Sequence, residues 1–169
     1  PIFRLERNDN VLKRDDWLTP RPLIELLGPF DLDPCASLLQ PWRTARTQWT
    51  VLDNIDVDRK FRGLTWLNPP YGRSVGLWLR RLADHGKGLA LVFARTDTSW
   101  FHDHVWPRAS AIHFFHGRLK FYDPTTKARG DRTMAPSCCI AYGDVAVERL
   151  RRLRGHHLYG GYQFRFANA

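Results

Sequence analysis

The chain has 169 residues and carries 26 Lys and Arg against 17 Asp and Glu, a formal net charge of +9. Its length suits a single domain with one core, and its 43% hydrophobic and 25% charged residues are typical of a globular protein. No apolar run approaches the roughly 20 residues that a membrane-spanning helix needs. A membrane span and wholesale disorder are therefore excluded.

The excess of positive charge favours a polyanionic partner, and nucleic acid is the first hypothesis. Seven Trp, five Tyr and ten Phe supply flat surfaces for stacking on bases, although a small core uses the same residues. Residues 1–16 contain neither an apolar block nor a small-residue cleavage site, which predicts a cytoplasmic protein without a signal peptide. Cys35, Cys138 and Cys139 have no zinc-site spacing and cannot form a disulfide framework, so we expect reduced thiols and no metal.

In chain order, the first predicted element is a helix with Thr19 as its N-cap and Pro20 in the first helical position, ending at Gly28. A short strand over 30–33 follows. It stops at Pro34, because the residue before a proline is driven to extended geometry.

The middle of the chain gives the clearest patterns. A compact apolar strand over 64–67 ends where two prolines follow Asn68. Residues 74–85 have the spacing of an amphipathic helix, with Gly86 as its C-cap, and 88–94 is a nearly continuous apolar run typical of a strand buried on both faces. The other predicted elements are strands at 47–52, 111–115 and 137–142 and helices at 98–106 and 145–153. This alternation predicts a three-layer α/β domain.

Three of these strands end in polar or proline-containing turns: Asp33-Pro34-Cys35-Ala36, Asn68-Pro69-Pro70-Tyr71 and Arg95-Thr96-Asp97. Ligands of open α/β sheets bind beyond the carboxyl ends of the strands. If the three strands are parallel, all three turns lie along one rim of the sheet, and this rim is the predicted active site.

The turn Asn68-Pro69-Pro70-Tyr71 is suited to binding an aromatic amine. The two prolines stiffen it, so that the Asn68 side-chain oxygen and the Pro69 carbonyl can accept both hydrogens of an exocyclic amino group while Tyr71 faces its ring. Accepting both hydrogens directs the nitrogen lone pair at an electrophile, which is catalysis by positioning and preorganised dipoles. The alternative is a rigid turn with no catalytic role.

Five blocks of the sequence resemble, in order and spacing, the successive motifs of the phage-type DNA adenine-N6 methyltransferases. They are Trp17-Leu18-Thr19-Pro20, residues 30–37, Asn68-Pro69-Pro70-Tyr71-Gly72, residues 94–101 and Gly117-Arg118-Leu119-Lys120-Phe121. The resemblance implies a Rossmann-like class I fold, mostly parallel with an antiparallel C-terminal strand, and methyl transfer from S-adenosylmethionine to adenine N6 in DNA. It also implies a place in the host cytoplasm if the protein is phage-encoded, and a link to restriction-modification.

By position, the resemblance assigns Thr19 and Pro20 to the methionine end of the donor, Trp17 to the donor site, and Asn68 to both donor and target. The floor of the donor pocket would be Asp33, Pro34, Cys35 and Ala36. Asp53 is the acid expected to accept from the donor's ribose or adenine. The sequence lacks the Gly-x-Gly of the wider fold after its first strand, where Ala36 and Ser37 are the small residues. A helix cap at Thr19 and a plain turn at Asp33 are the alternatives.

An adenine must be flipped out of a duplex, or lie in a single strand, before its amine is accessible. We expect Tyr71 to stack on it. The predicted DNA contacts are Arg73, Arg95, Arg118, Lys120, Lys127, Arg129 and Arg132. Most of these lie in the loop 117–132, for which a basic hairpin without a DNA role is the alternative. The arginines of the helix 145–153 serve either DNA contact or solubility.

We expect residues 1–16 to be an N-terminal extension, 17–142 the catalytic domain, and 143–169 a basic helix followed by a C-terminal strand or arm. The chain leaves no room for a separate target-recognition domain, which predicts a short recognition sequence or little sequence preference, and DNA affinity that depends steeply on salt. The competing functions are a cytosine-N4 or RNA amino-methyltransferase and a non-enzymatic DNA-binding module. The sequence leaves monomer and homodimer both open.

Overall fold

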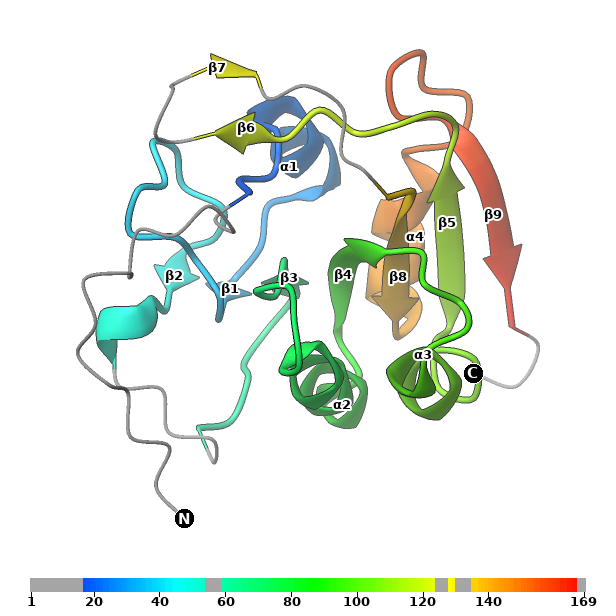
Figure 1. Ribbon diagram of the computed structural model, residues 1–169, viewed down its shortest axis with the longest axis horizontal. Helices are drawn as coiled ribbons and strands as arrows, with labels where there is room; N and C mark the ends of the chain where they lie inside the picture. Colours follow the sequence, from blue (N-terminus) through cyan, green and yellow to red (C-terminus); the bar gives the residue numbers. More distant parts are fainter. Residues whose placement is uncertain (1–16, 54–58, 124–127, 130–134, 167–169) are drawn as a thin grey trace.

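The computed structural model describes residues 17–53, 59–123, 128–129 and 135–166. Within them, one sheet has the strand order β2-β1-β3-β4-β8-β5-β9 (Figure 1). Its strands are β1 (Leu32–Asp33), β2 (Thr47–Gln48), β3 (Thr65–Leu67), β4 (Gly88–Phe93), β5 (Ala111–Phe115), β8 (Ser137–Tyr142) and β9 (Gly161–Arg165). β1, β2, β3 and β4 are parallel neighbours, β8 is antiparallel to both β4 and β5, and β9 is antiparallel to β5. The sheet is therefore mixed, with a parallel half and an antiparallel half.

Helices cover both faces of the sheet (Figure 1). They are α1 (Arg21–Leu27), α2 (Val75–His85), α3 (Ser99–His104) and α4 (Asp144–Arg151). In β4, Leu89 and Leu91 pack in the cluster that contains α1 and α4, while Ala90 and Val92 pack in the cluster that contains α2 and α3. Successive residues of a strand point to opposite faces, so β4 is buried on both. The predicted α/β class is confirmed.

Some element boundaries differ from the prediction. Helix α1 begins at Arg21 with Pro20 as its N-cap residue and makes no side-chain capping bond, so Thr19 as N-cap was wrong. The strand predicted over 47–52 ends at Gln48 and is followed by a 3₁₀ turn, Val51–Asp53. The turn forms because the Asp53 carboxylate accepts from the Thr50 main-chain N–H at 2.5 Å and from its hydroxyl at 3.0 Å.

A small hairpin lies beside the start of the described chain. It pairs β6 (Tyr122–Asp123) with β7 (Ala128–Arg129), and both strands lie near α1 in Figure 1. The main-chain N–H groups of Leu18 and Tyr122 each donate to the other residue's carbonyl, at 3.1 and 3.0 Å. The Tyr122 ring also packs edge-on against Trp42 at 5.1 Å between ring centroids. The basic loop is thus attached to the segment that leads into α1.

The arginines of α4 bind within the protein. Arg149 donates to the carbonyl of Gly28, and Arg152 donates to the carbonyls of Gly28 and Leu26 at 2.9 and 3.1 Å. These carbonyls lie at the C-terminal end of α1, where helix carbonyls lack partners within the helix. Positive charge is favourable at this end of a helix dipole. Neither solubility nor DNA contact, the two roles considered above, accounts for these two side chains.

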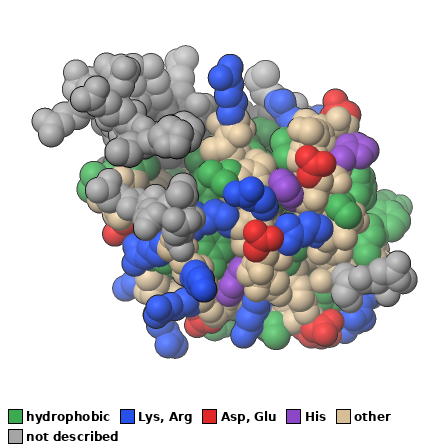
Figure 2. Space-filling model, turned by 90° about the horizontal axis from the view of Figure 1, so that it is seen from below, with side chains coloured by type: hydrophobic (Ala, Val, Ile, Leu, Met, Phe, Trp, Pro, Cys, Tyr) green, Lys and Arg blue, Asp and Glu red, His purple; other side chains and the backbone are tan. Residues whose placement is uncertain are grey.

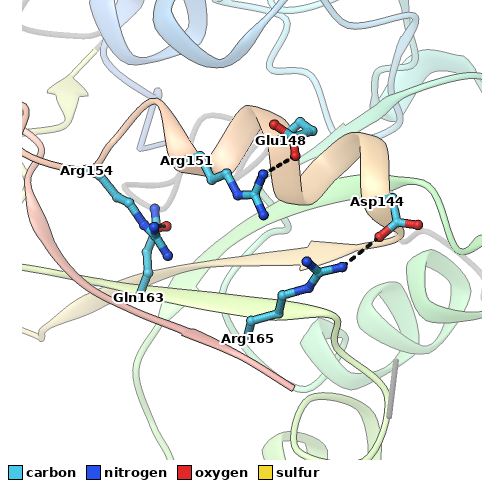
Figure 3. Close-up of polar contacts among 6 residues, drawn as sticks. All are labelled: Asp144, Glu148, Arg151, Arg154, Gln163 and Arg165. Atoms are coloured by element: carbon cyan, nitrogen blue, oxygen red, sulfur yellow. Dashed lines mark hydrogen bonds and ion pairs between the residues drawn. The ribbon is translucent and has the colours of Figure 1, made fainter. Parts of the chain in front are cut away.

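The outer side of α4 carries further internal contacts, drawn in Figure 3. Arg151 forms an ion pair with Glu148, and Arg154 donates to the Gln163 side chain of β9 at 2.8 Å. Arg165 of β9 pairs with Asp144 at 3.2 Å. The side chains of the two ion pairs are largely exposed, so each pair adds little to stability, but together these contacts join α4 to β9. In the described part of the chain, no helix has the length and apolar character to cross a membrane.

Candidate active site

A pocket lies beyond the carboxyl ends of β1 and β3, the rim that the sequence predicted. It is lined by most of the predicted donor-binding and catalytic residues: Trp17, Thr19, Asp33, Pro34, Cys35, Ala36, Asn68, Pro69, Pro70 and Tyr71. They come together because β1 and β3 are parallel neighbours, with Leu32 opposite Thr65. Of the third predicted turn, Arg95-Thr96-Asp97, no residue lines this pocket.

The side-chain amide of Asn68 is held in one orientation. Its Nδ2 donates to the main-chain carbonyl of Trp17 at 2.9 Å. A carbonyl oxygen can only accept, so this bond fixes which end of the amide is nitrogen. The Oδ1 atom is buried and has no hydrogen-bond partner among the described residues. Buried acceptors are usually satisfied, so Oδ1 is an unsatisfied acceptor on a residue that lines the pocket.

Tyr71 is held by a neighbouring ring. It stacks on Phe93 of β4 with 4.0 Å between ring centroids and 14° between the planes. Burial raises the pKa of the Tyr71 phenol well above its usual value, and its hydroxyl has no partner in the described chain. Tyr71 therefore presents a neutral, oriented ring to the pocket. Sequence reasoning missed Phe93, since nothing in an apolar strand marks which side chain will support a catalytic loop.

Asp33 is the acid inside the pocket. It is 3% exposed, and its carboxylate accepts from the Thr44 hydroxyl and from the Cys35 main-chain N–H, the latter at 3.0 Å. Burial raises the pKa of Asp33 to about 6, against the lowering effect of these two hydrogen bonds. Burial and the charge of Asp33 also raise the pKa of the Cys35 thiol. Cys35 is consequently a protonated wall residue and a poor nucleophile.

Two predicted donor contacts do not line the pocket. Pro20 is buried at the start of α1. Asp53 is fully exposed and binds Thr50 of its own turn, which lowers its pKa. The pocket reaches Thr50 and Val51 but not Asp53. Within the pocket lining, Asp33 is the carboxylate that the structure offers.

The pocket also has apolar walls that sequence reasoning did not select. Leu38, Leu39 and Val51 line it while remaining 44%, 39% and 58% exposed. Exposed apolar side chains gathered at a pocket are typical of a ligand-binding surface. The pair Leu38-Leu39, directly after a polar turn and outside any predicted element, was the available signal.

The predicted DNA-contacting residues come from three segments of the chain: the turn after β3, the turn after β4 and the loop 117–132. Arg73 follows Tyr71 and is exposed, and the Arg95 guanidinium lies 6.0 Å from the centroid of the Phe93 ring. Arg118 and Lys120 are exposed in the loop before β6. Arg129 belongs to β7, while Lys127 and Arg132 lie outside the described residues. The bridge between Leu18 and Tyr122 brings this basic loop next to Trp17 and the pocket.

Comparison with known families decides the assignment of the chain. A family model described as DNA N-6-adenine-methyltransferase (Dam) matches residues 7–150. The chain belongs to the Dam family. The match spans α1 through most of α4, so it includes both turns that line the pocket. No curated protein and no solved structure gives a match to the chain.

Membership in the Dam family identifies the general class of activity, methylation of adenine N6 in DNA, and the class of substrate. It agrees with the resemblance carried by the five sequence blocks. The match begins ten residues before Trp17, inside the segment expected to be an extension, and it ends within α4.

Proposed function

We propose that this protein transfers a methyl group from S-adenosylmethionine to N6 of an adenine that is flipped from a duplex or lies in a single strand. The observation that carries the proposal is the Asn68 side-chain oxygen, a buried acceptor without a partner in the described chain, in a pocket shared with Tyr71 and Asp33. Membership in the Dam family supports the same reaction.

The pocket lining fits the donor chemically. Besides Asn68 Oδ1, it holds buried polar groups without a described partner: Thr19 Oγ1, Gln40 Nε2, Trp49 Nε1 and the Tyr71 hydroxyl. The donor has an ammonium, a carboxylate, two ribose hydroxyls and an adenine, so it can use donors, acceptors and an apolar wall together. We assign the Asp33 carboxylate to the positive charge of the donor. We assign the apolar wall of Leu38, Leu39 and Val51 to the adenine of the donor.

The donor supplies an electrophilic methyl group, and the protein's part is positioning. Asn68 Oδ1 and the Pro69 carbonyl accept the two hydrogens of the target amine, which turns the nitrogen lone pair toward the donor. The methyl carbon passes from the donor's sulfur to the amine nitrogen, the donor leaves as S-adenosylhomocysteine, and one amine hydrogen leaves as a proton. Asn68 does not titrate, so it serves as an acceptor and not as a general base.

Tyr71 is the stacking surface that we assign to the target base. One face of its ring is taken by Phe93 at 4.0 Å, so the base would extend an existing stack. Stacking of a base on an aromatic side chain is worth about 1–3 kcal/mol and tolerates any base. Selection of adenine must then come from contacts to its amine and ring edge.

We further propose that the sheet has the class I methyltransferase layout implied by the resemblance. Support comes from the parallel strands β1 and β3, whose carboxyl ends line the pocket, and from the helices on both faces of the sheet.

The test is the identity of the product. DNA is incubated with the protein and S-adenosylmethionine, digested to nucleosides and analysed for modified bases, with donor-free protein as the control. The proposal predicts N6-methyldeoxyadenosine. N4-methyldeoxycytidine, or methylation of RNA alone, would assign the same pocket to another amine. Absence of heat on titration with S-adenosylmethionine would indicate a DNA-binding module without activity.

A further inference from the structure

A second cavity lies at the opposite ends of the strands that form the pocket. It is lined at the starts of β1 and β2 by Leu32 and Thr47, and by Trp49, which also lines the donor pocket. Four basic side chains surround it: Arg46, Arg59, Lys60 and Arg62. The cavity therefore combines positive charge with an aromatic wall, on the far side of Trp49 from the proposed donor.

Among the described residues, one carboxylate lines this cavity. It belongs to Asp31 and accepts from the Leu64 main-chain N–H at 2.8 Å. Within the described residues, no ion pair involves any of the four cations, all of which are exposed. Asp53 lies near enough to Arg59 for that charge to contribute to its lowered pKa. The described lining therefore holds four positive charges and one carboxylate, a balance that favours an anion.

The loop that carries three of these cations is held rigidly against α2. Arg81 donates to the Arg59 carbonyl at 2.5 Å, and the His85 ring bonds the Gly63 carbonyl at 2.8 Å. The Arg59 guanidinium itself lies 4.0 Å over the Trp49 ring. Since the backbone is fixed at both ends of the loop, binding an anion here costs little ordering of the chain.

Two further exposed cations lie in or just before the helix α2, whose last residue, His85, contacts Gly63 of the cavity lining. Arg73 lies just before the helix, next to the Asn68–Tyr71 turn, and Arg80 is exposed at its middle. Figure 2 shows the face below the sheet in Figure 1, where Lys and Arg side chains gather over the centre and left of the surface. Eleven helical residues span about 16 Å, the length of roughly five base pairs. We call Arg73, Arg80, Arg62, Lys60, Arg59 and Arg46 the basic path.

We propose that the cavity at Arg46, Arg59, Lys60 and Arg62 is a phosphate site that holds the backbone of the substrate DNA, with the basic path leading to it from the target base. The inference rests on the proposed function for its choice of DNA as the source of the phosphate. A contact about five base pairs from the target reads no sequence. It gives the domain a second point of attachment, which orients the strand at the pocket.

The test is the salt dependence of DNA binding by the full chain, measured by fluorescence anisotropy on a duplex of about 20 base pairs. The variant Lys60→Gln with Arg62→Gln leaves Arg59 on Trp49 and removes two exposed cations. Each lost phosphate contact makes the slope of log K against log salt concentration less negative by about 0.9, so we expect a change of about 2. The matched control, Arg151→Gln at the end of α4 with Arg154→Gln in the turn after it, removes the same charge and should leave the slope unchanged.

An unchanged slope in Lys60→Gln with Arg62→Gln, or an equal reduction in the α4 control, would overturn the proposal. Titration with inorganic phosphate separates the two sources of the anion. If the variant loses phosphate binding but keeps the slope for DNA, the cavity serves a small free phosphate and the assignment to DNA is wrong. The binding measurement needs no methyl transfer. If the unmodified protein methylates nothing but the variant still shows the reduced salt slope, the proposed function is rejected and the phosphate site is retained.

Discussion

The side chain of Asn68 is held by the backbone of Trp17, a residue 51 positions earlier, through one hydrogen bond of 2.9 Å. This bond orients the amide and leaves its oxygen buried without a partner among the described residues. Leu18, the next residue, is bonded to Tyr122 at the base of the basic loop. The proposed DNA-contacting loop and the proposed catalytic amide are thus connected through two adjacent residues.

Replacing Asn68 tests the role of this oxygen. Asn68→Ala removes the acceptor, and we expect turnover to fall at least about 100-fold, the scale of losing one preorganised dipole. Donor affinity should change less than about tenfold, because most of the pocket remains. Asn68→Asp should also lose turnover, since it cannot donate to the Trp17 carbonyl. Single-turnover methylation and calorimetry measure the two effects, and Arg151→Gln is the control. Retained turnover in Asn68→Ala would remove the proposed role.

The stack of Tyr71 on Phe93 gives a second, graded prediction. Tyr71→Ala should raise KM for DNA and lower kcat, because the base loses a surface worth about 1–3 kcal/mol. Phe93→Leu keeps Tyr71 but removes the ring that orients it, so we expect a smaller loss, about two- to tenfold in kcat/KM. Steady-state kinetics on one DNA substrate ranks the two variants. A larger loss of kcat/KM in Phe93→Leu than in Tyr71→Ala would contradict the proposal that Tyr71 contacts the base and Phe93 only supports Tyr71.

Asp33 predicts how stability depends on pH. Its pKa is about 6 in the folded protein and near 3.8 when the chain is unfolded, so the folded state binds the proton more tightly. The free energy of unfolding should therefore fall as pH rises from about 4 to about 6, by roughly 3 kcal/mol from this residue. In Asp33→Asn this fall should be smaller. Urea unfolding across this pH range measures both proteins, and identical pH profiles would contradict the burial of the charge.

Strand ends and apolar patterns were predictable because they depend on local sequence. The strands at 111–115 and 137–142 have the predicted bounds, and the turns at Asp33 and Asn68 meet because parallel strands share a rim. The start of α1 was not predictable in this way, since Pro22 fits the first helical turn as well as Pro20 does. Asp53 was a wrong prediction as a pocket residue, because its carboxylate binds the Thr50 N–H of its own turn instead.

Contacts between distant segments could not be derived from the sequence. Nothing local indicates that Asn68 will meet the Trp17 carbonyl, or that Thr44 will satisfy a buried Asp33. The arginines of α4 were the clearest case. A basic helix in a protein of net charge +9 favours DNA contact, yet Arg149 and Arg152 bind carbonyls of α1.

The hydrogen bonds of Arg149 and Arg152 to the α1 carbonyls lead to a further prediction. Arg149→Ala with Arg152→Ala should lower the free energy of unfolding by about 1–3 kcal/mol, because hydrogen bonds to charged donors are among the stronger ones. The log–log salt slope of DNA binding should stay within error of the unmodified protein. Chemical unfolding and salt titration are run on the same preparation. An unchanged stability with a reduced slope would return these arginines to the DNA surface.

The most direct measurement is a crystal structure with bound S-adenosylmethionine or a stable analogue of it. The account predicts the donor in the pocket of Asp33 and Asn68, with its methyl carbon near enough to Asn68 Oδ1 that an amine held there lies about 3–3.5 Å from the carbon. A donor bound elsewhere, or an Asn68 amide turned so that its nitrogen faces the methyl group, would contradict it.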